Sequence, residues 1–279
     1  MHPDSLDKIK VSDIPLEKIF TVSKSDKLAQ LIHLMSKKGA DRAIITSEGI
    51  PIGVATIKDV FIKLSTRRLI GLSPSSMSVS GFMSEKFVSG KLDEDLLTIS
   101  RRMRDEDISA LPIISDRQPI GLVTRKMIIG LLKNKGQMKI KDIATSSIIT
   151  IDSDAKLPQA LEKIRKSPIK EIVVVVDDKP VGIISEKEIA LTLFDLLSRD
   201  SIRHADSAFK KLLVMDVMKR ADEYVEPDSY IEKAIDILFD KGLNTLPVMA
   251  NNEFIGLLTR DVIFLKFLEL EEREGWKRL

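Results

Sequence analysis

Two pairs of side chains combine a hydroxyl and a carboxyl group at the same spacing, and they are the best candidates for ligand chemistry in this sequence. Thr56 is followed three residues later by Asp59, and Ser185 by Glu188, each where a helix is expected to begin. The start of a helix offers free backbone N–H groups and a positive dipole end to an anion such as phosphate. A carboxylate can accept hydrogen bonds from two neighbouring hydroxyl groups. The same pairs also match a capping box, in which they satisfy the N–H groups of their own helix, and the two roles are compatible.

Both pairs belong to a segment that occurs four times along the chain. Each copy has an apolar strand, a polar turn, a second strand that contains a glycine, and a Thr or Ser that opens a helix. The glycines are Gly53, Gly121, Gly182 and Gly256, and the hydroxyl residues three positions later are Thr56, Thr124, Ser185 and Thr259. An amphipathic helix precedes each copy, and its apolar stripe always begins 25 residues before the glycine. This constant spacing indicates an internal repeat.

The repeat predicts an α+β fold made of four βαββα units, each with a small sheet. We expect these units at residues 10–70, 78–135, 138–199 and 211–270, and they are called repeats 1 to 4 below. A unit of about 60 residues has a marginal core of its own, so the units should pair through their sheet faces. The chain order favours two modules, one of repeats 1 and 2 and one of repeats 3 and 4.

Composition argues against several classes of function. The 279 residues include 44 Lys and Arg against 42 Asp and Glu, so that the formal net charge is only +2. Proteins that bind nucleic acids usually have a dominant basic face, and a nucleic-acid partner is therefore not expected. The absence of cysteine excludes disulfides, thiol catalysis and cysteine-ligated zinc. The three histidines form no metal-binding motif and no catalytic motif is present, so we expect neither an enzyme nor a metal cofactor.

Features of export and of membrane insertion are missing from the sequence. The first ten residues are polar and do not contain the apolar core of a signal peptide. No apolar run reaches the roughly 20 residues that a membrane helix needs. We therefore expect a cytoplasmic protein that has no membrane partner.

The repeated segment resembles the cystathionine-β-synthase (CBS) domain, here in four copies that form two tandem pairs. The resemblance covers about residues 11–270. It is carried by the glycine–hydroxyl–acid segments, by Pro112 and Pro247 in the apolar strands, and by the lead segments Gly81-Phe82-Met83 and Asp216-Val217-Met218-Lys219. Four copies are similar to the nucleotide-sensing gamma subunit of AMP-activated kinase and to stand-alone archaeal proteins. The resemblance implies binding of an adenosine ligand (AMP, ADP, ATP or S-adenosylmethionine) and no catalysis.

The resemblance also assigns roles to residues where the helices open. It implies that the hydroxyl binds phosphate and that the acid three residues later binds the ribose. The other repeat of the pair would hold the base with a first-strand hydroxyl and backbone groups. Repeat 1 has the full pattern in Thr56 and Asp59, and its partner surface would be Ser89, Ala110 and Leu111. Repeat 3 has a near match in Ser185 and Glu188, which would face Tyr224 and Thr245.

Repeats 2 and 4 depart from this pattern. They keep Thr124 and Thr259 but have Met127 and Val262 where the acid should be. Asp261 lies one position early, about 100° around the helix, and is not expected to replace the acid directly. The partner strands carry the hydroxyl residues Thr21 and Thr150, and the basic residues that could hold phosphates are Arg125, Lys126 and Arg260. We expect one to three occupied sites, with the Asp59 site filled first.

The function that follows is that of a regulatory sensor of adenine nucleotides. Nucleotide binding would shift the packing of the two modules, and an unidentified protein in trans would read the change. A homodimer is a further expectation. Two alternatives remain open: a scaffold or oligomerisation module with decayed clefts, suggested by Met127 and Val262, and a binder of S-adenosylmethionine. The second alternative would require an apolar niche in place of the basic residues.

Overall fold

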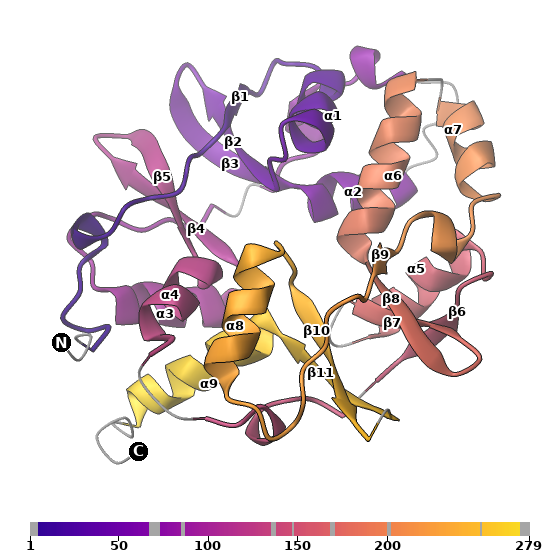
Figure 1. Cartoon of the computed structure of the whole chain (residues 1–279). Helices are drawn as coiled ribbons and strands as arrows, with labels where there is room; N and C mark the ends of the chain where they lie inside the picture. The colour runs from indigo at the N-terminus through magenta and orange to yellow at the C-terminus, as the bar shows by residue number, and fades with distance from the viewer. Residues whose placement is uncertain are drawn as a thin grey trace. The chain divides into compact units, whose positions relative to one another are not determined.

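The computed structural model describes residues 5–66, 73–84, 87–134, 138–146, 148–167, 171–199, 202–251 and 253–273. It confirms the predicted α+β fold of four repeats, each with a β-hairpin between two helices (Figure 1). The predicted ends of repeats 1 and 2, at residues 70 and 135, lie outside the described residues.

The helices and strands of the four repeats follow one order. Repeat 1 contains β1 (Thr21–Ser23), α1 (Leu28–Lys37), β2 (Arg42–Ser47), β3 (Ile50–Thr56) and α2 (Ile57–Thr66). Repeat 2 contains α3 (Leu96–Asp105), β4 (Ala110–Ser115), β5 (Gln118–Thr124) and α4 (Arg125–Leu132). Repeat 3 contains β6 (Thr150–Asp152), α5 (Leu157–Lys166), β7 (Glu171–Val176), β8 (Lys179–Ser185) and α6 (Glu186–Arg199), followed by α7 (Ile202–Phe209). Repeat 4 contains β9 (Lys219–Arg220), α8 (Ile231–Asp240), β10 (Thr245–Ala250), β11 (Glu253–Thr259) and α9 (Arg260–Glu272).

The first helix of each repeat buries the apolar stripe that its periodicity predicts. In α1 the buried residues are Leu28, Leu31, Ile32 and Met35, at the i, i+3, i+4 and i+7 positions. In α3 the stripe includes Ser100, which is fully buried although its side chain is polar. Its hydroxyl donates a hydrogen bond of 2.7 Å to the carbonyl oxygen of Leu96, and the helix itself therefore satisfies it.

The first strand differs between the repeats. In repeats 1 and 3 it is a short strand, with β1 parallel to β2 and β6 parallel to β7. In repeats 2 and 4 it is reduced to single parallel bridges, between Gly90 and Ile113 and between Val225 and Val248. The predicted βαββα order therefore holds in all four repeats, but two of them have only one bridge in place of the first strand.

The segment that leads into each repeat pairs with the hairpin of another repeat. These four lead segments begin with 3-10 turns at Val11–Asp13, Val79–Gly81, Ile140–Asp142 and Val214–Asp216. The antiparallel pairs that they form are Glu17 with Leu122, Ser84 with Val54, Thr145 with Leu257, and Lys219 with Ile183. Repeats 1 and 2 thus exchange their lead segments, and so do repeats 3 and 4.

This exchange explains the repeated glycine. A Cβ atom at Gly53 would lie 2.6 Å from the carbonyl oxygen of Ser84. A Cβ atom at Gly182 would lie 2.8 Å from the carbonyl oxygen of Lys219. Any side chain at these positions would overlap with the backbone of the lead segment, and the close approach therefore requires glycine.

The chain divides into two compact units, each with its own hydrophobic core. The repeat 1/3 unit comprises Ile19–Phe87 and Ile149–Arg220, and α1 and α2 pack against α6 in it. The repeat 2/4 unit comprises Met1–Lys18, Val88–Ile148 and Ala221–Leu279, and α3 and α4 pack against α9 in it. These units cut across the predicted modules because the helices of alternate repeats share a core. The modules of repeats 1 with 2 and 3 with 4 stay a prediction.

Candidate ligand site

The opening of α2 holds Thr56 and Asp59 in a closed ring of hydrogen bonds. Oδ2 of Asp59 accepts hydrogen bonds from the backbone N–H of Thr56 (3.1 Å) and from its hydroxyl (2.6 Å). In return, the backbone N–H of Asp59 donates to Oγ1 of Thr56 (3.1 Å). This is the capping-box geometry that the spacing predicts, and it fixes the rotamers of both side chains at the start of the helix.

The ring uses only one of the two carboxylate oxygens of Asp59. Within the described part of the chain, Oδ1 accepts no hydrogen bond and belongs to no ion pair. The side chain is half-buried, so that this oxygen is held in place without being sealed off. The helix cap is therefore complete while one strong acceptor remains open to a ligand.

The opening of α6 repeats this ring with a longer acid. Oε2 of Glu188 accepts from the backbone N–H of Ser185 (3.2 Å) and from its hydroxyl, and the backbone N–H of Lys187 donates to the Ser185 hydroxyl (3.1 Å). The second oxygen, Oε1, is paired with Nζ of Lys219 at 2.9 Å. The side chain of Glu188 is only 12% exposed. In repeat 3 both oxygens of the acid thus have protein partners.

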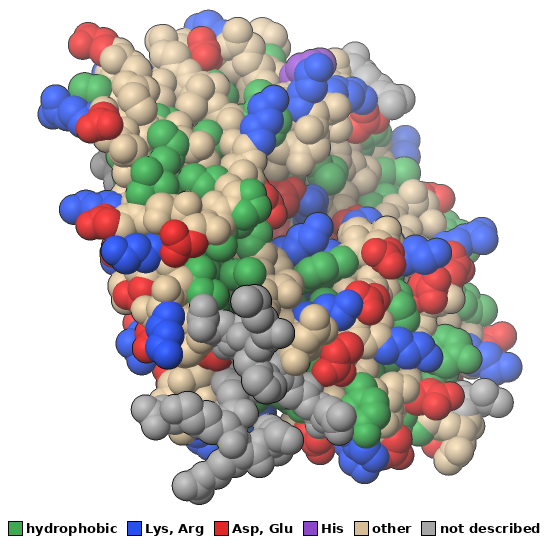
Figure 2. Space-filling view, turned by 60° about the vertical axis from the view of Figure 1, so that its left-hand side comes forward, with side chains coloured by type: hydrophobic (Ala, Val, Ile, Leu, Met, Phe, Trp, Pro, Cys, Tyr) green, Lys and Arg blue, Asp and Glu red, His purple; other side chains and the backbone are tan. Residues whose placement is uncertain are grey.

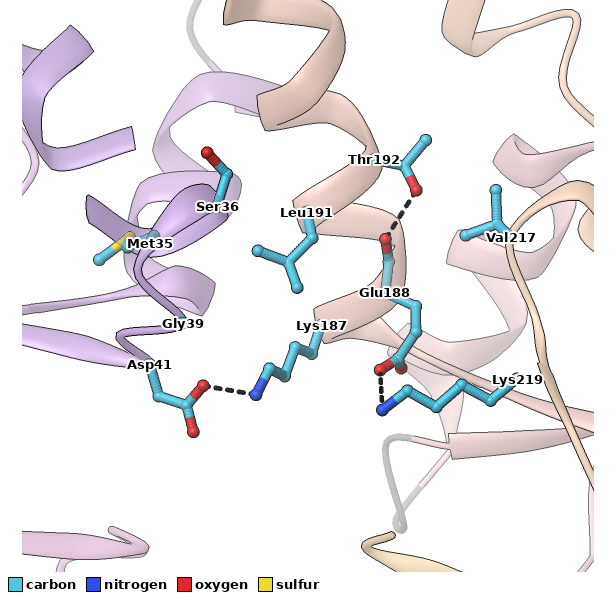
Figure 3. A pocket seen from close by; sticks show the side chains of 10 residues that line it. All are labelled: Met35, Ser36, Gly39, Asp41, Lys187, Glu188, Leu191, Thr192, Val217 and Lys219. Atoms are coloured by element: carbon cyan, nitrogen blue, oxygen red, sulfur yellow. Dashed lines mark hydrogen bonds and ion pairs between the residues drawn. The ribbon is translucent and has the colours of Figure 1, made fainter. Parts of the chain in front are cut away.

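A cavity of about 430 Å³ lies beside Glu188, within the repeat 1/3 unit (Figure 3). Its walls come from the C-terminal end of α1, from the first turns of α6 and from the lead segment of repeat 4. The lining residues are Met35, Ser36, Gly39, Asp41, Lys187, Glu188, Leu191, Thr192, Val217 and Lys219. Lys187 forms an ion pair with Asp41 across one side, while Glu188 and Lys219 face each other on the other side of α6 (Figure 3). The size suits a small organic ligand.

Lys219 and Asp41 are site residues that sequence reasoning missed. Lys219 stands in the lead segment that carries the family resemblance, but nothing in its spacing relates it to Glu188. A comparison of lead segments could have found it, because it follows Met218 as Ser84 follows Met83. Asp41 has no such signal, since its partner Lys187 lies 146 residues away in the sequence.

Repeats 2 and 4 cap their helices with the hydroxyl alone. Oγ1 of Thr124 accepts from the backbone N–H of Met127 (3.3 Å) and donates to Oε1 of Glu17 (3.0 Å). Oγ1 of Thr259 accepts from the backbone N–H of Val262 (3.1 Å). Neither opening has a carboxyl group three positions later, and the carboxylate at Thr124 is that of Glu17, from the lead segment of repeat 1.

Arg125, the first residue of α4, is buried against α3 and α9. Nη1 lies 2.9 Å from Oδ1 of Asp261, and Nη2 donates to the carbonyl oxygen of Met103 (3.1 Å). The guanidinium also lies over the ring of Phe264, 4.9 Å from its centroid. Asp261, which stands one position before the missing acid, is thus the counter-ion of Arg125. A phosphate contact by Arg125 stays a prediction, and it would require the guanidinium to leave these partners.

The other two basic residues that are predicted to contact phosphate, Arg260 and Lys126, lie against an aromatic ring. Nη2 of Arg260 donates to the carbonyl oxygen of Leu238 (2.7 Å), and its guanidinium lies 5.4 Å from the ring centroid of Phe239. Nζ of Lys126 lies 5.2 Å from the same centroid. Both side chains therefore stabilise the packing of α8, and their predicted phosphate contacts remain untested.

Removal of Asp261 should lower the stability of the chain, because Arg125 is buried and would lose its closest counter-ion. We expect Asp261→Ala to lower the free energy of unfolding by about 1–2 kcal/mol, because it deprives a buried guanidinium of its closest counter-ion. The loss is smaller than for a fully buried ion pair, which would cost about 3–5 kcal/mol, because Asp261 itself is 62% exposed and Asp107 lies 3.7 Å from the guanidinium. Urea unfolding of Asp261→Ala, of Arg125→Met and of the double variant would measure it. The double variant should recover most of the loss, and simple additivity would contradict the proposed pairing.

The predicted base-binding residues are divided between the two units. Thr21 and Thr150 are exposed at the first positions of β1 and β6, in the repeat 1/3 unit. The remaining ones belong to the repeat 2/4 unit, where Ala110, Leu111 and Thr245 are buried, Ser89 is half-buried and Tyr224 is 58% exposed. Because Thr56 and Asp59 lie in one unit and Ser89, Ala110 and Leu111 in the other, their joint contribution to one cleft stays a prediction.

The backbone at Ser89 is anchored by an ion pair that the sequence did not suggest. Nη1 of Arg102 donates to the carbonyl oxygen of Ser89 (2.7 Å), and Nη2 pairs with Oε1 of Glu94 at 2.5 Å. The hydrogen bond from Arg102 holds the pKa of Glu94 below its ordinary value, although partial burial opposes this shift. This pair fixes the strand position that the resemblance assigns to the base.

Comparison with known proteins identifies the repeat. A family model described as CBS domain matches residues 11–66, 79–134, 140–195 and 214–268. The chain belongs to the CBS domain family. The four matched stretches correspond to repeats 1 to 4 and confirm the resemblance seen in the sequence.

Two of the solved structures that resemble this chain share its fold over nearly the whole length. Protein MJ1225 from Methanocaldococcus jannaschii, which has been proposed as an archaeal homolog of g-AMPK, is 19% identical with a TM-score of 0.79. An uncharacterized conserved protein from Pyrococcus horikoshii is 16% identical with a TM-score of 0.59. Each comparison covers 93% of this chain and 100% of the other. At these identities the likeness establishes the fold alone.

Curated relatives match shorter stretches of the CBS domains. Protein MK0525 of Methanopyrus kandleri is 26% identical over 41% of this chain and 61% of its own length. The homoserine O-acetyltransferase of Methanohalobium evestigatum is 27% identical over 44% of this chain. Only 24% of that enzyme is matched, so its activity does not transfer. The chain thus spans less than two thirds of these relatives.

The surface charges agree with the balanced numbers of basic and acidic residues in the sequence. Basic and acidic side chains are interspersed on the face that Figure 2 shows. Among the described residues, no helix is both long enough and apolar enough to cross a membrane.

Proposed function

We propose that this chain is a non-catalytic regulatory protein that binds an adenine nucleotide (AMP, ADP or ATP) at the opening of α2. Pairs of CBS domains are generally regulatory modules that bind nucleotides or related ligands. The observation that carries the proposal for this chain is the open oxygen of Asp59, held by a completed helix cap beside the Thr56 hydroxyl.

The geometry of this opening suits a nucleotide for two reasons. The capping ring fixes the Asp59 carboxylate, so that hydrogen bonds from a ribose diol to Oδ1 would cost little side-chain entropy. The phosphate would lie at the start of α2, where the helix dipole favours an anion. To donate to the phosphate, the Thr56 hydroxyl would have to turn away from Oδ2 of Asp59, to which it donates in the ring. In this proposal Ser89, Ala110 and Leu111 contact the base, as the family resemblance implies.

The four openings are expected to differ in occupancy. Repeat 1 offers an open carboxylate oxygen, and repeat 3 offers Glu188, whose second oxygen is paired with Lys219. In repeats 2 and 4 the acid is absent and Arg125 is engaged with Asp261, which favours a structural role for these openings. We infer one or two nucleotides per chain, read by a protein partner in trans or by a second copy of the chain.

Calorimetric titration of the nucleotide-stripped chain with AMP, ADP, ATP and S-adenosylmethionine tests this function. We expect an adenine nucleotide to bind with a Kd on the order of micromolar and to raise the melting temperature. Binding of S-adenosylmethionine in preference to every nucleotide would change the ligand class. No heat with any of the four ligands, together with an unchanged melting temperature at saturation, would leave the scaffold as the better function.

A further inference from the structure

Lys219 occupies in repeat 3 the place that Ser84 occupies in repeat 1. Both residues belong to exchanged lead segments, and both pair with the residue that follows the repeated glycine, namely Ile183 and Val54. The position is therefore equivalent in the two repeats, but its chemistry differs. A serine leaves the second oxygen of Asp59 open, whereas a lysine closes the second oxygen of Glu188 with an ion pair of 2.9 Å.

A ligand diol at Glu188 would have to displace this ammonium group. Oε1 is the only oxygen of Glu188 outside the capping ring, and the side chain is only 12% exposed, so the loss of its ion-pair partner would be costly unless the ligand replaces it. Lys219 would then stand beside the cavity without a counter-ion. Among the described residues that line this cavity, the other cation is Lys187, which is already paired with Asp41 (Figure 3).

The charges that line the cavity determine which ligands can displace Lys219 from Glu188. Two lysines and two carboxylates line it, and they are joined as two ion pairs. A neutral nucleoside that took Glu188 would leave the ammonium of Lys219, whose side chain is 50% exposed, with water in place of its counter-ion, and a cationic ligand would add a second positive charge. A ligand with both a diol and a phosphate would supply a partner for Glu188 and a partner for Lys219 at once.

We propose that Lys219 makes the opening of repeat 3 selective for anionic adenosine ligands over neutral or cationic ones. The inference rests on the proposed function, because it assigns the ribose to Glu188. In the free chain Lys219 holds Glu188, and in the complex it turns to the ligand's phosphate while the diol takes its place on Oε1. The lead segment of repeat 4 thus supplies the specificity residue of the repeat 3 site.

The test removes the Asp59 carboxylate, which is expected to weaken the repeat 1 site by roughly 10- to 100-fold and to leave repeat 3 as the tighter site. Titration of Asp59→Ala with AMP and with adenosine gives the ratio of the two dissociation constants at this site, and we expect AMP to bind at least tenfold more tightly. In Asp59→Ala/Lys219→Met the ratio should fall to nearly one, because adenosine gains access to Glu188 while AMP loses its cation. Lys219→Arg in the same background should keep the preference for AMP. Lys166→Met is the matched control, since Lys166 pairs with Glu162 on the exposed surface of α5, and it should leave the ratio unchanged.

Each other outcome counts against a specific statement. A ratio near one in Asp59→Ala, or a ratio that Lys219→Met does not change in a chain with an unaltered melting temperature, would overturn the role of Lys219. If the unmodified chain binds AMP but Asp59→Ala does not, repeat 3 binds no nucleotide and the proposal for Lys219 is overturned. The proposed nucleotide site of repeat 1 would be supported by the same result. No binding by the unmodified chain would overturn the proposed function as well.

Discussion

Asp59→Ala is expected to weaken binding of the adenine nucleotide at repeat 1 by roughly 10- to 100-fold. The substitution removes an ionised acceptor of the ribose diol, and hydrogen bonds to a charged group contribute about 1.5–3 kcal/mol. The open Oδ1 makes this the largest functional effect expected from a single side chain in the described structure. Calorimetric titration of the variant against the unmodified chain measures the loss.

The same substitution also removes half of a helix cap, and the two effects must be separated. Loss of the cap should lower the free energy of unfolding by about 1 kcal/mol. Asp95 provides a matched control, because its carboxylate caps α3 by accepting from the backbone N–H of Thr98 at 2.7 Å. Asp95→Ala should lose a similar amount of stability and keep its nucleotide affinity. If Asp59→Ala behaves like Asp95→Ala in both measurements, Asp59 acts in capping alone.

Gly53→Ala is expected to lower the free energy of unfolding by about 3 kcal/mol. The added Cβ would lie 2.6 Å from the carbonyl oxygen of Ser84 and 3.2 Å from the sulfur of Met83. Because a backbone oxygen cannot turn aside like a flexible side chain, β3 and the lead segment must separate. Their two hydrogen bonds, of 3.2 and 2.7 Å between Val54 and Ser84, would then be strained or lost. Urea or thermal unfolding measures the change.

Gly130→Ala is the control for this prediction. Gly130 lies within α4, and a Cβ there would meet only the ring of Phe239 at 3.5 Å, an ordinary contact distance. Alanine in a helix is more favourable than glycine by roughly 0.5–1 kcal/mol, so this variant should be slightly more stable than the unmodified chain. If Gly53→Ala were equally well tolerated, the steric explanation of the repeated glycine would be wrong.

The local pattern of the sequence determined the helices and the hairpins. The apolar stripe that begins at Leu28 recurs at a constant distance from each glycine, and the structure places a helix and a hairpin at every recurrence. Such features depend on residues close together in the chain, so periodicity predicts them. The sequence could predict the capping rings at Thr56 and Ser185 for the same reason, because the hydroxyl and the acid of each ring lie within one helical turn of each other.

Contacts between distant segments were decided only by the tertiary structure. The spacing of the glycines does not say that the lead segments are exchanged between repeats, because a glycine in a strand is also compatible with a bulge. The ion pair between Arg125 and Asp261 joins residues 136 positions apart, so the sequence alone could not show that the guanidinium already has a partner. Repeat 3 is a second example. Ser185 and Glu188 match the motif in the sequence, but only the structure shows that Lys219 forms an ion pair with the second carboxylate oxygen of Glu188. The sequence thus determined which groups stand at each helix opening, and the packing of remote segments decided which of them remain open to a ligand.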